Sequence, residues 1–335
     1  MLKALVTAEL DINTLIKTID TIKFDTAGYA KDHKVMESKD LANIVGAYDI
    51  LISEFETINK NVIENAKNLK LIICCRGGVK SVVDMDAAAK KNITVLHNAG
   101  RNASAVSEIV MGYILDMCRN ITYSNNLIHN KIITTDSRNI PTEYKDTIWG
   151  LDDNSPYHTL RGRSPRLMTL GIVGFGNVGR EVAKKAECFG MDILIFDPID
   201  ASFSKSENVK SVSFEELLKS SDIVSLHCPL TKDNYHMIGK KEFKMMKKSA
   251  FFINAARGDL VDEDALIDAL NSGEIKAAAL DVVSKEPIDS SSKLLDVPGL
   301  IITPHIAGAS DEVVLKGTEM VIHKLLTWQN DERVC

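Results

Sequence analysis

The feature that most constrains this chain is the glycine-rich stretch Gly174–Gly179 (GFGNVG) and its setting. The apolar run Leu167–Val173 before it predicts a strand, and Asn177–Phe189 after the first glycines predicts a helix. A G-x-G-x-x-G pattern alone is weak evidence, but between a strand and a helix it is typical of a dinucleotide-binding turn. The sequence therefore predicts a βαβ nucleotide-binding unit.

Each glycine of the pattern has a physical role in such a turn. Gly174 permits the tight turn, Gly176 lets the backbone approach a pyrophosphate, and Gly179 lets helix and strand pack closely. Asp197 ends the next predicted strand, where a carboxylate accepts the ribose hydroxyls of NAD. Positions 198–200 hold no basic residue for a 2′-phosphate, which favours NAD over NADP. The alternative is a structural turn without a ligand.

Short apolar runs alternate with amphipathic segments along the whole chain, as in parallel sheets covered on both faces. Four such runs in the first hundred residues predict strands: Leu2–Thr7, Tyr48–Ser53, Leu69–Cys75 and Ile93–Leu96. Six later ones predict a second sheet: Leu167–Val173, Met191–Phe196, Asp222–His227, Ala250–Asn254, Ala277–Asp281 and Leu300–Thr303. The fold class is α/β, with a doubly wound parallel Rossmann sheet inserted into a smaller flavodoxin-like substrate domain.

The 335 residues are too many for one ordinary core, so two domains are expected. The apolar positions of a final helix, Glu312–Thr327, suit packing back on the first domain. We therefore predict a discontinuous substrate domain, 1–102 with 307–335, and an NAD-binding domain, 103–306. The latter includes a polar arm, 120–166, which is too long for a plain loop.

Composition and charge narrow the class of partner. A net charge of −6 argues against nucleic acid, which requires a basic surface. No apolar run approaches the roughly 18 residues of a membrane span. Glu9 and Asp11 interrupt the start of the chain, so no export signal is expected. The six cysteines form no C-x-x-C pair and no metal-ligand spacing, which predicts reduced thiols, a cytoplasmic protein and no metal.

Chemically active side chains follow three of the predicted strands, where open α/β sheets bind ligands. The three stretches are Asn254–Gly258 (NAARG), Asp281–Pro287 (DVVSKEP) and Thr303–Gly308 (TPHIAG). Taken singly, Arg257, Glu286 and His305 each have an ordinary structural explanation, such as a surface ion pair or a hydrogen-bonded loop histidine. Their joint placement after strands of one nucleotide-binding sheet points instead to a reacting site.

These motifs, with GFGNVG and in this order, resemble those of the D-isomer-specific 2-hydroxyacid dehydrogenases, most closely the D-3-phosphoglycerate dehydrogenase-like branch. The likeness includes Arg76–Gly78 and Asn98–Glu108, and so covers nearly the whole chain. It implies a catalytic trio of Arg257, Glu286 and His305. It implies cofactor contacts from Asn177, Val178, Asp197, Cys228, Pro229, Ala255, Asp281 and Gly308, and substrate contacts from Arg76, Gly77, Gly78 and Arg257.

The chemistry of these side chains suits the implied reaction between a D-2-hydroxy acid and a 2-keto acid. The guanidinium of Arg257 offers a fixed fork of donors for a carboxylate and its neighbouring carbonyl. His305 can donate a proton to the carbonyl oxygen or take it back, a role that suits histidine as a residue type because the free side chain titrates near neutral pH. A carboxylate at Glu286 would orient the imidazole ring and stabilise its charged form.

Two questions stay open at this level. Side-chain specificity is expected from loops that carry the cations Arg76, Lys80 and Arg101, which would meet either a substrate phosphate or solvent. The alternative function is an NAD(H)-sensing binding protein that resembles the family's transcriptional corepressors, because such relatives keep the same trio. A homodimer is implied by the resemblance.

Overall fold

The computed structural model describes residues 1–134, 155–198 and 208–334, and it describes side chains as far as residue 330. Part of the predicted polar arm, and positions 199 and 200 beside Asp197, lie outside the described residues. The chain divides into two compact units, Met1–Ala105 with Ala309–Cys335, and Val106–Gly308. These boundaries lie within three residues of the predicted domain limits.

The first unit is built on a five-stranded parallel sheet in the order β2-β1-β3-β4-β5, which is the flavodoxin-like order. Its strands are β1 (Leu2–Val6), β2 (Ile22–Thr26), β3 (Ile50–Ser53), β4 (Leu71–Cys74) and β5 (Thr94–His97). The sequence reading missed β2, an edge strand in which Lys23 and Asp25 interrupt the apolar pattern. The predicted fold class is confirmed for this unit.

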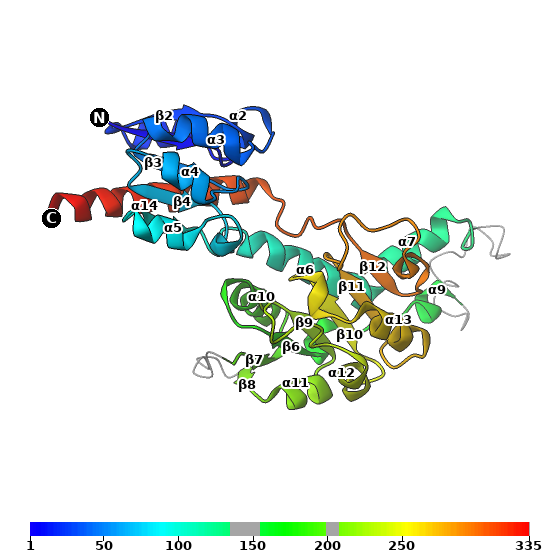
Figure 1. Cartoon of the computed structure of the whole chain (residues 1–335). Coiled ribbons are helices and arrows are strands. Elements are labelled where there is room, and N and C mark those ends of the chain that lie inside the picture. The colour runs from blue at the N-terminus through cyan, green and yellow to red at the C-terminus, as the bar shows by residue number, and fades with distance from the viewer. Residues whose placement is uncertain (135–154, 199–207, 335) are drawn as a thin grey trace. The chain divides into compact units, whose positions relative to one another are not determined.

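Helices cover both faces of this sheet (Figure 1). They are α1 (Ile12–Thr18), α2 (Tyr29–Asp32), α3 (Ser38–Ile44), α4 (Lys60–Asn65), α5 (Met85–Lys90) and α14 (Asp311–Val334), with 3₁₀ turns η1 (Val45–Ala47) and η2 (Val79–Ser81). Alternate strand residues face opposite sides. Leu5 and Leu51 pack with α3 and α4, whereas Val6 packs with α1 and α14. Val321 and Leu325 of α14 therefore belong to the core of the first unit.

The second unit carries a seven-stranded parallel sheet in the order β12-β11-β10-β9-β6-β7-β8. The strands are β6 (Thr169–Val173), β7 (Asp192–Phe196), β8 (Val209–Ser211), β9 (Ile223–Leu226), β10 (Phe251–Asn254), β11 (Ala277–Leu280) and β12 (Leu300–Ile302). The short edge strand β8 was not predicted. Strand order reverses between β6 and β9, and open sheets bind ligands at the carboxyl side of such a switch point.

Two helical layers sandwich this sheet, with α6 and α10 on one face and α11 to α13 on the other (Figure 1). The helices are α6 (Ala103–Arg119), α7 (Ile121–His129), α9 (Pro156–Thr159), α10 (Asn177–Cys188), α11 (Phe214–Ser220), α12 (Lys240–Met245) and α13 (Glu263–Asn271), with 3₁₀ turns η5 (Pro165–Leu167), η6 (Gly258–Leu260) and η7 (Lys293–Asp296). Ser213 and Asp262 cap α11 and α13 by accepting from backbone N–H groups. The predicted Rossmann architecture is confirmed.

No helix among the described residues is long and apolar enough to cross a membrane. Cys74, Cys75 and Cys118 are buried free thiols, and Cys188 is an exposed one. Within the described ranges no three His, Cys, Asp or Glu side chains gather as metal ligands would.

Candidate active site

The glycine turn lies between β6 and α10 and depends on backbone that only glycine adopts easily. Gly174 has a φ of +92°, and a Cβ built on it would lie 2.6 Å from the backbone nitrogen of Cys228. The turn is tied to the end of β7, because the Phe175 N–H donates to Oδ2 of Asp197 at 2.7 Å. The turn therefore sits at the carboxyl end of three neighbouring strands.

The open side of this turn fits a dinucleotide. A Cβ on Gly176 would meet no atom within 4 Å, so the backbone there faces open space. Gly176 also caps α10 without a side chain, which leaves the N–H groups of the first turn, at Asn177 and Val178, available to an anion. Gly179 packs in the opposite direction, since its Cβ would lie 2.3 Å from the Gly174 carbonyl oxygen. The turn is therefore open at Gly176 and closed at Gly179.

The other predicted cofactor residues lie along the same sheet edge. Cys228 and Pro229 follow β9, Ala255 follows β10, and Gly308 lies in the segment after β12. The amide of Asn234 donates to the Pro229 carbonyl at 2.8 Å and orders that loop. Their contacts with a bound cofactor remain predictions.

A partly buried histidine that was not predicted as a site residue lies beside the turn, and its backbone N–H donates to the Val173 carbonyl at 2.7 Å. His227 lies directly before Cys228, and its Nε2 lies 2.8 Å from Oγ of Ser225. Its Nδ1 is buried without a hydrogen-bond partner in the part of the chain that the structure describes. Burial lowers the pKa of His227 to about 3, so the ring is neutral.

Arg257 projects from a turn that a buried asparagine shapes. Asn254, at the end of β10, is fully buried; its Nδ2 donates to the Arg257 carbonyl at 2.8 Å, and its Oδ1 accepts from the Ala256 N–H at 3.0 Å. The Arg257 side chain is exposed, with Nη1 2.5 Å from the Ala256 carbonyl. No role was predicted for Asn254 from the sequence. A polar residue at the end of an apolar strand is the feature that could have indicated one.

The loop after β11, which carries Glu286, contacts the Arg257 turn at Gly258. A Cβ on Gly258 would lie 2.1 Å from the Val283 carbonyl carbon and 2.3 Å from the Ser284 nitrogen. No side chain fits in that space. Because Gly258 is glycine, the loop that carries Arg257 lies directly against the loop that carries Glu286.

Glu286 and His305 form a hydrogen-bonded pair across two loops. Nδ1 of His305 lies 2.6 Å from Oε2 of Glu286, and Oε1 of Glu286 accepts from the Val283 N–H at 3.2 Å. An ionised carboxylate only accepts, so Nδ1 carries the shared proton and Nε2 takes no part in the pair. Both side chains are partly exposed, at 36% for Glu286 and 49% for His305.

Asp281 anchors the segment that carries His305. This aspartate is 1% exposed, and its carboxylate accepts from Thr303 Oγ1 and from the Ile306 and Ala307 N–H groups at 2.5 to 2.9 Å. The Asp281 carbonyl also accepts from the His305 N–H at 2.8 Å. His305 itself has a left-handed φ of +57°, a conformation that such anchoring must maintain. The predicted contact of Asp281 with the nicotinamide stays a prediction.

The predicted substrate turn, Arg76 to Gly78, belongs to the first unit and follows β4. Arg76 is half-buried, and neither it nor Lys80 has an ion-pair partner among the described residues. Arg101 differs, because its guanidinium forms an ion pair with the buried Glu54. Burial raises the pKa of Glu54, and the charge of Arg101 opposes that rise. Arg101 is therefore neutralised locally.

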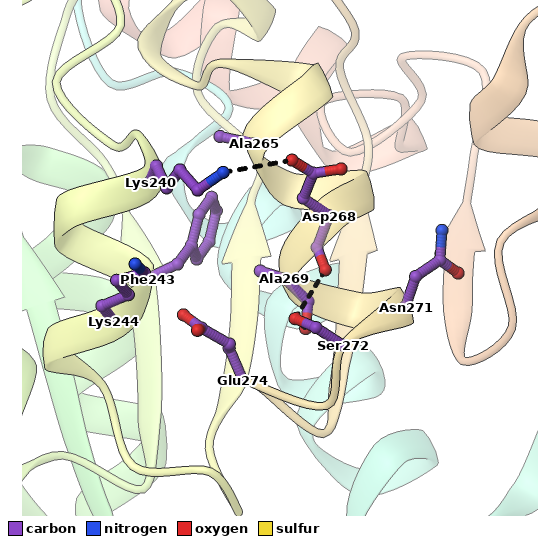
Figure 2. Close-up of a pocket in the computed structure, with 9 residues that line it drawn as sticks. All are labelled: Lys240, Phe243, Lys244, Ala265, Asp268, Ala269, Asn271, Ser272 and Glu274. Atoms are coloured by element: carbon purple, nitrogen blue, oxygen red, sulfur yellow. Dashed lines mark hydrogen bonds and ion pairs between the residues drawn. The ribbon is translucent and has the colours of Figure 1, made fainter.

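A cavity of about 490 Å³ lies elsewhere in the second unit, between α12 and α13 (Figure 2). It contains none of the predicted site residues, and two of its charged side chains form an ion pair, with Lys240 Nζ 3.6 Å from Asp268 Oδ2. Ser272 and Glu274 on its rim lead into the start of β11, so it reaches the amino edge of the sheet. The predicted catalytic residues lie at the carboxyl edge, so this cavity is separate from the candidate site.

A Rossmann sheet with a dinucleotide turn and an acid–base pair on one edge is the architecture of nucleotide-dependent dehydrogenases. Residues 111–307 match the family model described as D-isomer specific 2-hydroxyacid dehydrogenase, NAD binding domain. This chain belongs to that family. The match confirms the predicted family and the predicted cofactor, NAD, for the second unit.

Relatives match over most of the chain. A glyoxylate reductase from Thermococcus litoralis is 33% identical over 98% of this chain and 94% of its own length. A hydroxypyruvate reductase from Thermotoga maritima is 33% identical over 85% of this chain and 87% of its own length. A D-3-phosphoglycerate dehydrogenase from Methanocaldococcus jannaschii is 34% identical over 96% of this chain but only 56% of its own length. The branch named from the sequence is therefore one of several similar ones.

Among solved structures, the D-lactate dehydrogenase from Lactobacillus jensenii, determined with NAD⁺, superposes with a TM-score of 0.76. It is 25% identical, and the match covers 98% of this chain and 97% of that one. The similarity therefore extends over both units.

Proposed function

We propose that this protein is an NAD-dependent D-2-hydroxyacid dehydrogenase that acts on a small 2-keto acid and its D-2-hydroxy acid. The observation that carries the proposal is the Glu286–His305 pair, which leaves one imidazole nitrogen for proton exchange on the sheet edge that holds the dinucleotide turn. A structural nucleotide turn requires no such pair. The family match and the named activities of the relatives support the same reaction class.

In this proposal NAD, when bound, supplies or accepts the hydride. Arg257 binds the substrate carboxylate and polarises the adjacent carbonyl through its fork of N–H donors. His305 delivers a proton from Nε2 to the carbonyl oxygen as negative charge develops there, and recovers it in the oxidation direction. Glu286 holds the ring through Nδ1 and stabilises its positive charge.

We further propose that the substrate is short and unphosphorylated, such as glyoxylate or hydroxypyruvate. Of the three cations expected near the substrate, Arg101 is neutralised by Glu54, so Arg76 and Lys80 are left. A phosphate carries close to two negative charges beside the substrate carboxylate and needs several such partners. The names of the two relatives that match over most of their own length agree with this choice.

The test is a screen of glyoxylate, hydroxypyruvate, pyruvate and 3-phosphohydroxypyruvate, followed by the loss of NADH absorbance. We expect turnover with one of the first two and a much lower kcat/KM with the phosphorylated acid. Tight NADH binding without turnover of any acid would favour the NAD(H)-sensing alternative and contradict the proposal.

The matched variant is His305→Asn, because asparagine also tolerates a left-handed backbone. We expect its rate to fall at least about 100-fold while the NADH dissociation constant stays unchanged. Near-normal turnover would contradict the role of His305. The homodimer is a further proposal, tested by light scattering on the purified chain.

A further inference from the structure

We propose that Tyr113 is a positioning residue for His305, acting through Thr303 and Asp281; this inference rests on the proposed function. The hydroxyl of Tyr113, in α6, is hydrogen-bonded to Oγ1 of Thr303, at the end of β12. Oγ1 of Thr303 in turn donates to Oδ1 of Asp281 at 2.5 Å. A chain of hydroxyl groups thus joins a long helix to the aspartate that anchors the histidine segment.

The direction of the hydrogen bonds between Tyr113, Thr303 and Asp281 follows from the carboxylate at the end of the series. The Asp281 carboxylate has no hydrogen to give, so the single hydrogen of the Thr303 hydroxyl points toward it. The Thr303 oxygen then accepts from Tyr113, which must be protonated. Burial raises the pKa of Tyr113 to about 12, so its hydroxyl keeps its proton at any working pH.

This series of hydrogen bonds ends at the Asp281 carboxylate, which holds the backbone that follows His305. The Asp281 carboxylate accepts from the Ile306 N–H at 2.9 Å and the Ala307 N–H at 2.8 Å. These are the two peptide groups that follow His305, which itself has the strained φ of +57°. Fixing the carboxylate therefore fixes the direction in which the imidazole leaves the backbone.

A purely apolar role does not account for the tyrosine. Tyr113 is 6% exposed and packs in the core with Ile114, Phe175 and Ala307, where phenylalanine has the same ring volume. Burying a hydroxyl costs free energy unless it is hydrogen-bonded, and here it is bonded to the strand that leads into the His305 segment. The hydroxyl links that segment to α6, a helix of 17 residues.

The first test is kinetic. Tyr113→Phe removes only the hydroxyl, and we expect kcat with the best 2-keto acid to fall about tenfold, since small misplacements of a reacting group have effects of this order. The NADH dissociation constant and the KM for the acid should change less than twofold. Thr303→Val should reproduce the loss, and Thr303→Ser should rescue it. Tyr113→Phe combined with Thr303→Val should be no worse than Thr303→Val alone, because both break one chain.

The second test needs no turnover. Hydrogen exchange of the Ile306 and Ala307 amides, in the protein without cofactor, should be about tenfold faster in Tyr113→Phe than in the wild type. The control is Tyr123→Phe on α7, whose side chain is 60% exposed and which should change nothing.

The outcomes separate the two proposals. Unchanged kcat and unchanged exchange in Tyr113→Phe would overturn the positioning role. An inactive wild type would contradict the proposed function, while the exchange measurement still decides whether Tyr113 anchors the segment. Should Tyr113→Phe fail to fold, the Thr303→Val and Thr303→Ser pair gives the same comparison, and equal kcat in those two variants contradicts the proposal.

Discussion

Gly258 and Val283 are in backbone contact, and a Cβ on the glycine would lie only 2.1 Å from the Val283 carbonyl carbon. This contact joins the loop after β10 to the loop after β11. The two loops carry Arg257 and Glu286, so the separation of a guanidinium and a carboxylate is set by the absence of one side chain.

Gly258→Ala should damage both stability and activity. The methyl group must push the two loops apart, at a cost of about 3 kcal/mol in the free energy of unfolding. We expect a large fall in kcat/KM and a lower midpoint in urea unfolding. The control is Gly112→Ala on α6, where a Cβ meets nothing within 4 Å and alanine should stabilise the helix by up to about 1 kcal/mol. A wild-type midpoint for Gly258→Ala would contradict the contact.

Alanine at Gly174 should lower the stability of the protein, whereas alanine at Gly176 should lower its affinity for NADH. Gly174→Ala meets a φ of +92° and the backbone of Cys228, so the folded protein should be destabilised. Gly176 has a φ of −75° and open space at its Cβ, so Gly176→Ala should keep the wild-type melting temperature. Its NADH dissociation constant should rise at least about tenfold, because the methyl group occupies pyrophosphate space. Calorimetric titration with NADH checks this, and unaltered affinity would place the pyrophosphate elsewhere.

Glu286→Gln should lower kcat by about 10- to 100-fold with little change in NADH affinity. The amide keeps the size of the side chain but loses the negative charge that stabilises protonated His305. Steady-state kinetics with a saturating 2-keto acid measure the effect. The control is Lys285→Met in the same loop, an exposed residue whose ion pair with Asp289 is solvent-facing. Equal losses in the two variants would show that only the loop had been disturbed.

His227 should make the protein less stable in acid. Its pKa is about 3 in the folded state and near 6.5 in the unfolded chain, so below pH 6.5 the unfolded state binds more protons. The stabilisation is complete above pH 6.5 and is lost as pH falls toward 3. Urea unfolding at several pH values between 7.5 and 4.5 should show a shallower decline for His227→Gln than for the wild type. Parallel declines would mean that the ring is not buried as described.

Substitution of Arg101 should lower the stability of the protein, whereas substitution of Arg76 should weaken substrate binding. Arg101→Ala leaves the buried carboxylate of Glu54 without its partner, so the free energy of unfolding should fall by about 3 kcal/mol. The double variant with Glu54→Gln should recover much of that loss. Arg76→Ala should leave unfolding unchanged and raise the KM for the 2-keto acid. The reverse pattern in urea unfolding and kinetics would exchange the assigned roles.

Most of the fold could be predicted because parallel strands buried on both faces leave continuous apolar runs in the sequence. The helix predicted at Asn177–Phe189 is observed at Asn177–Cys188, and Ser213 and Asp262 begin their helices as capping residues do. The strands that were missed, β2 and β8, are edge strands in which charged residues interrupt the apolar pattern. Edge strands carry less apolar pattern, and local sequence is therefore a weaker guide to them.

The candidate site was predictable where its residues lie within one motif and not where they meet across the chain. Gly174, Glu286 and His305 stand in short stretches with a chemical meaning of their own. The hydrogen bond between Tyr113 and Thr303 joins positions 190 residues apart, and the pairing of Arg101 with Glu54 cancels a charge that looked available. Such facts depend on tertiary packing, which composition and spacing do not contain.

The helix α14 closes the core of the first unit with residues that are made only after the second unit. Val321, Leu325 and Trp328 cover a face of the sheet whose strands come from the first hundred residues. During synthesis on the ribosome, that face of the sheet stays uncovered until the whole intervening Rossmann unit has been translated. The second unit can fold first, since domains generally fold as units. Folding order in the cell should thus run against chain order, and truncation before residue 321 should leave the early strands exposed to chaperones or proteases.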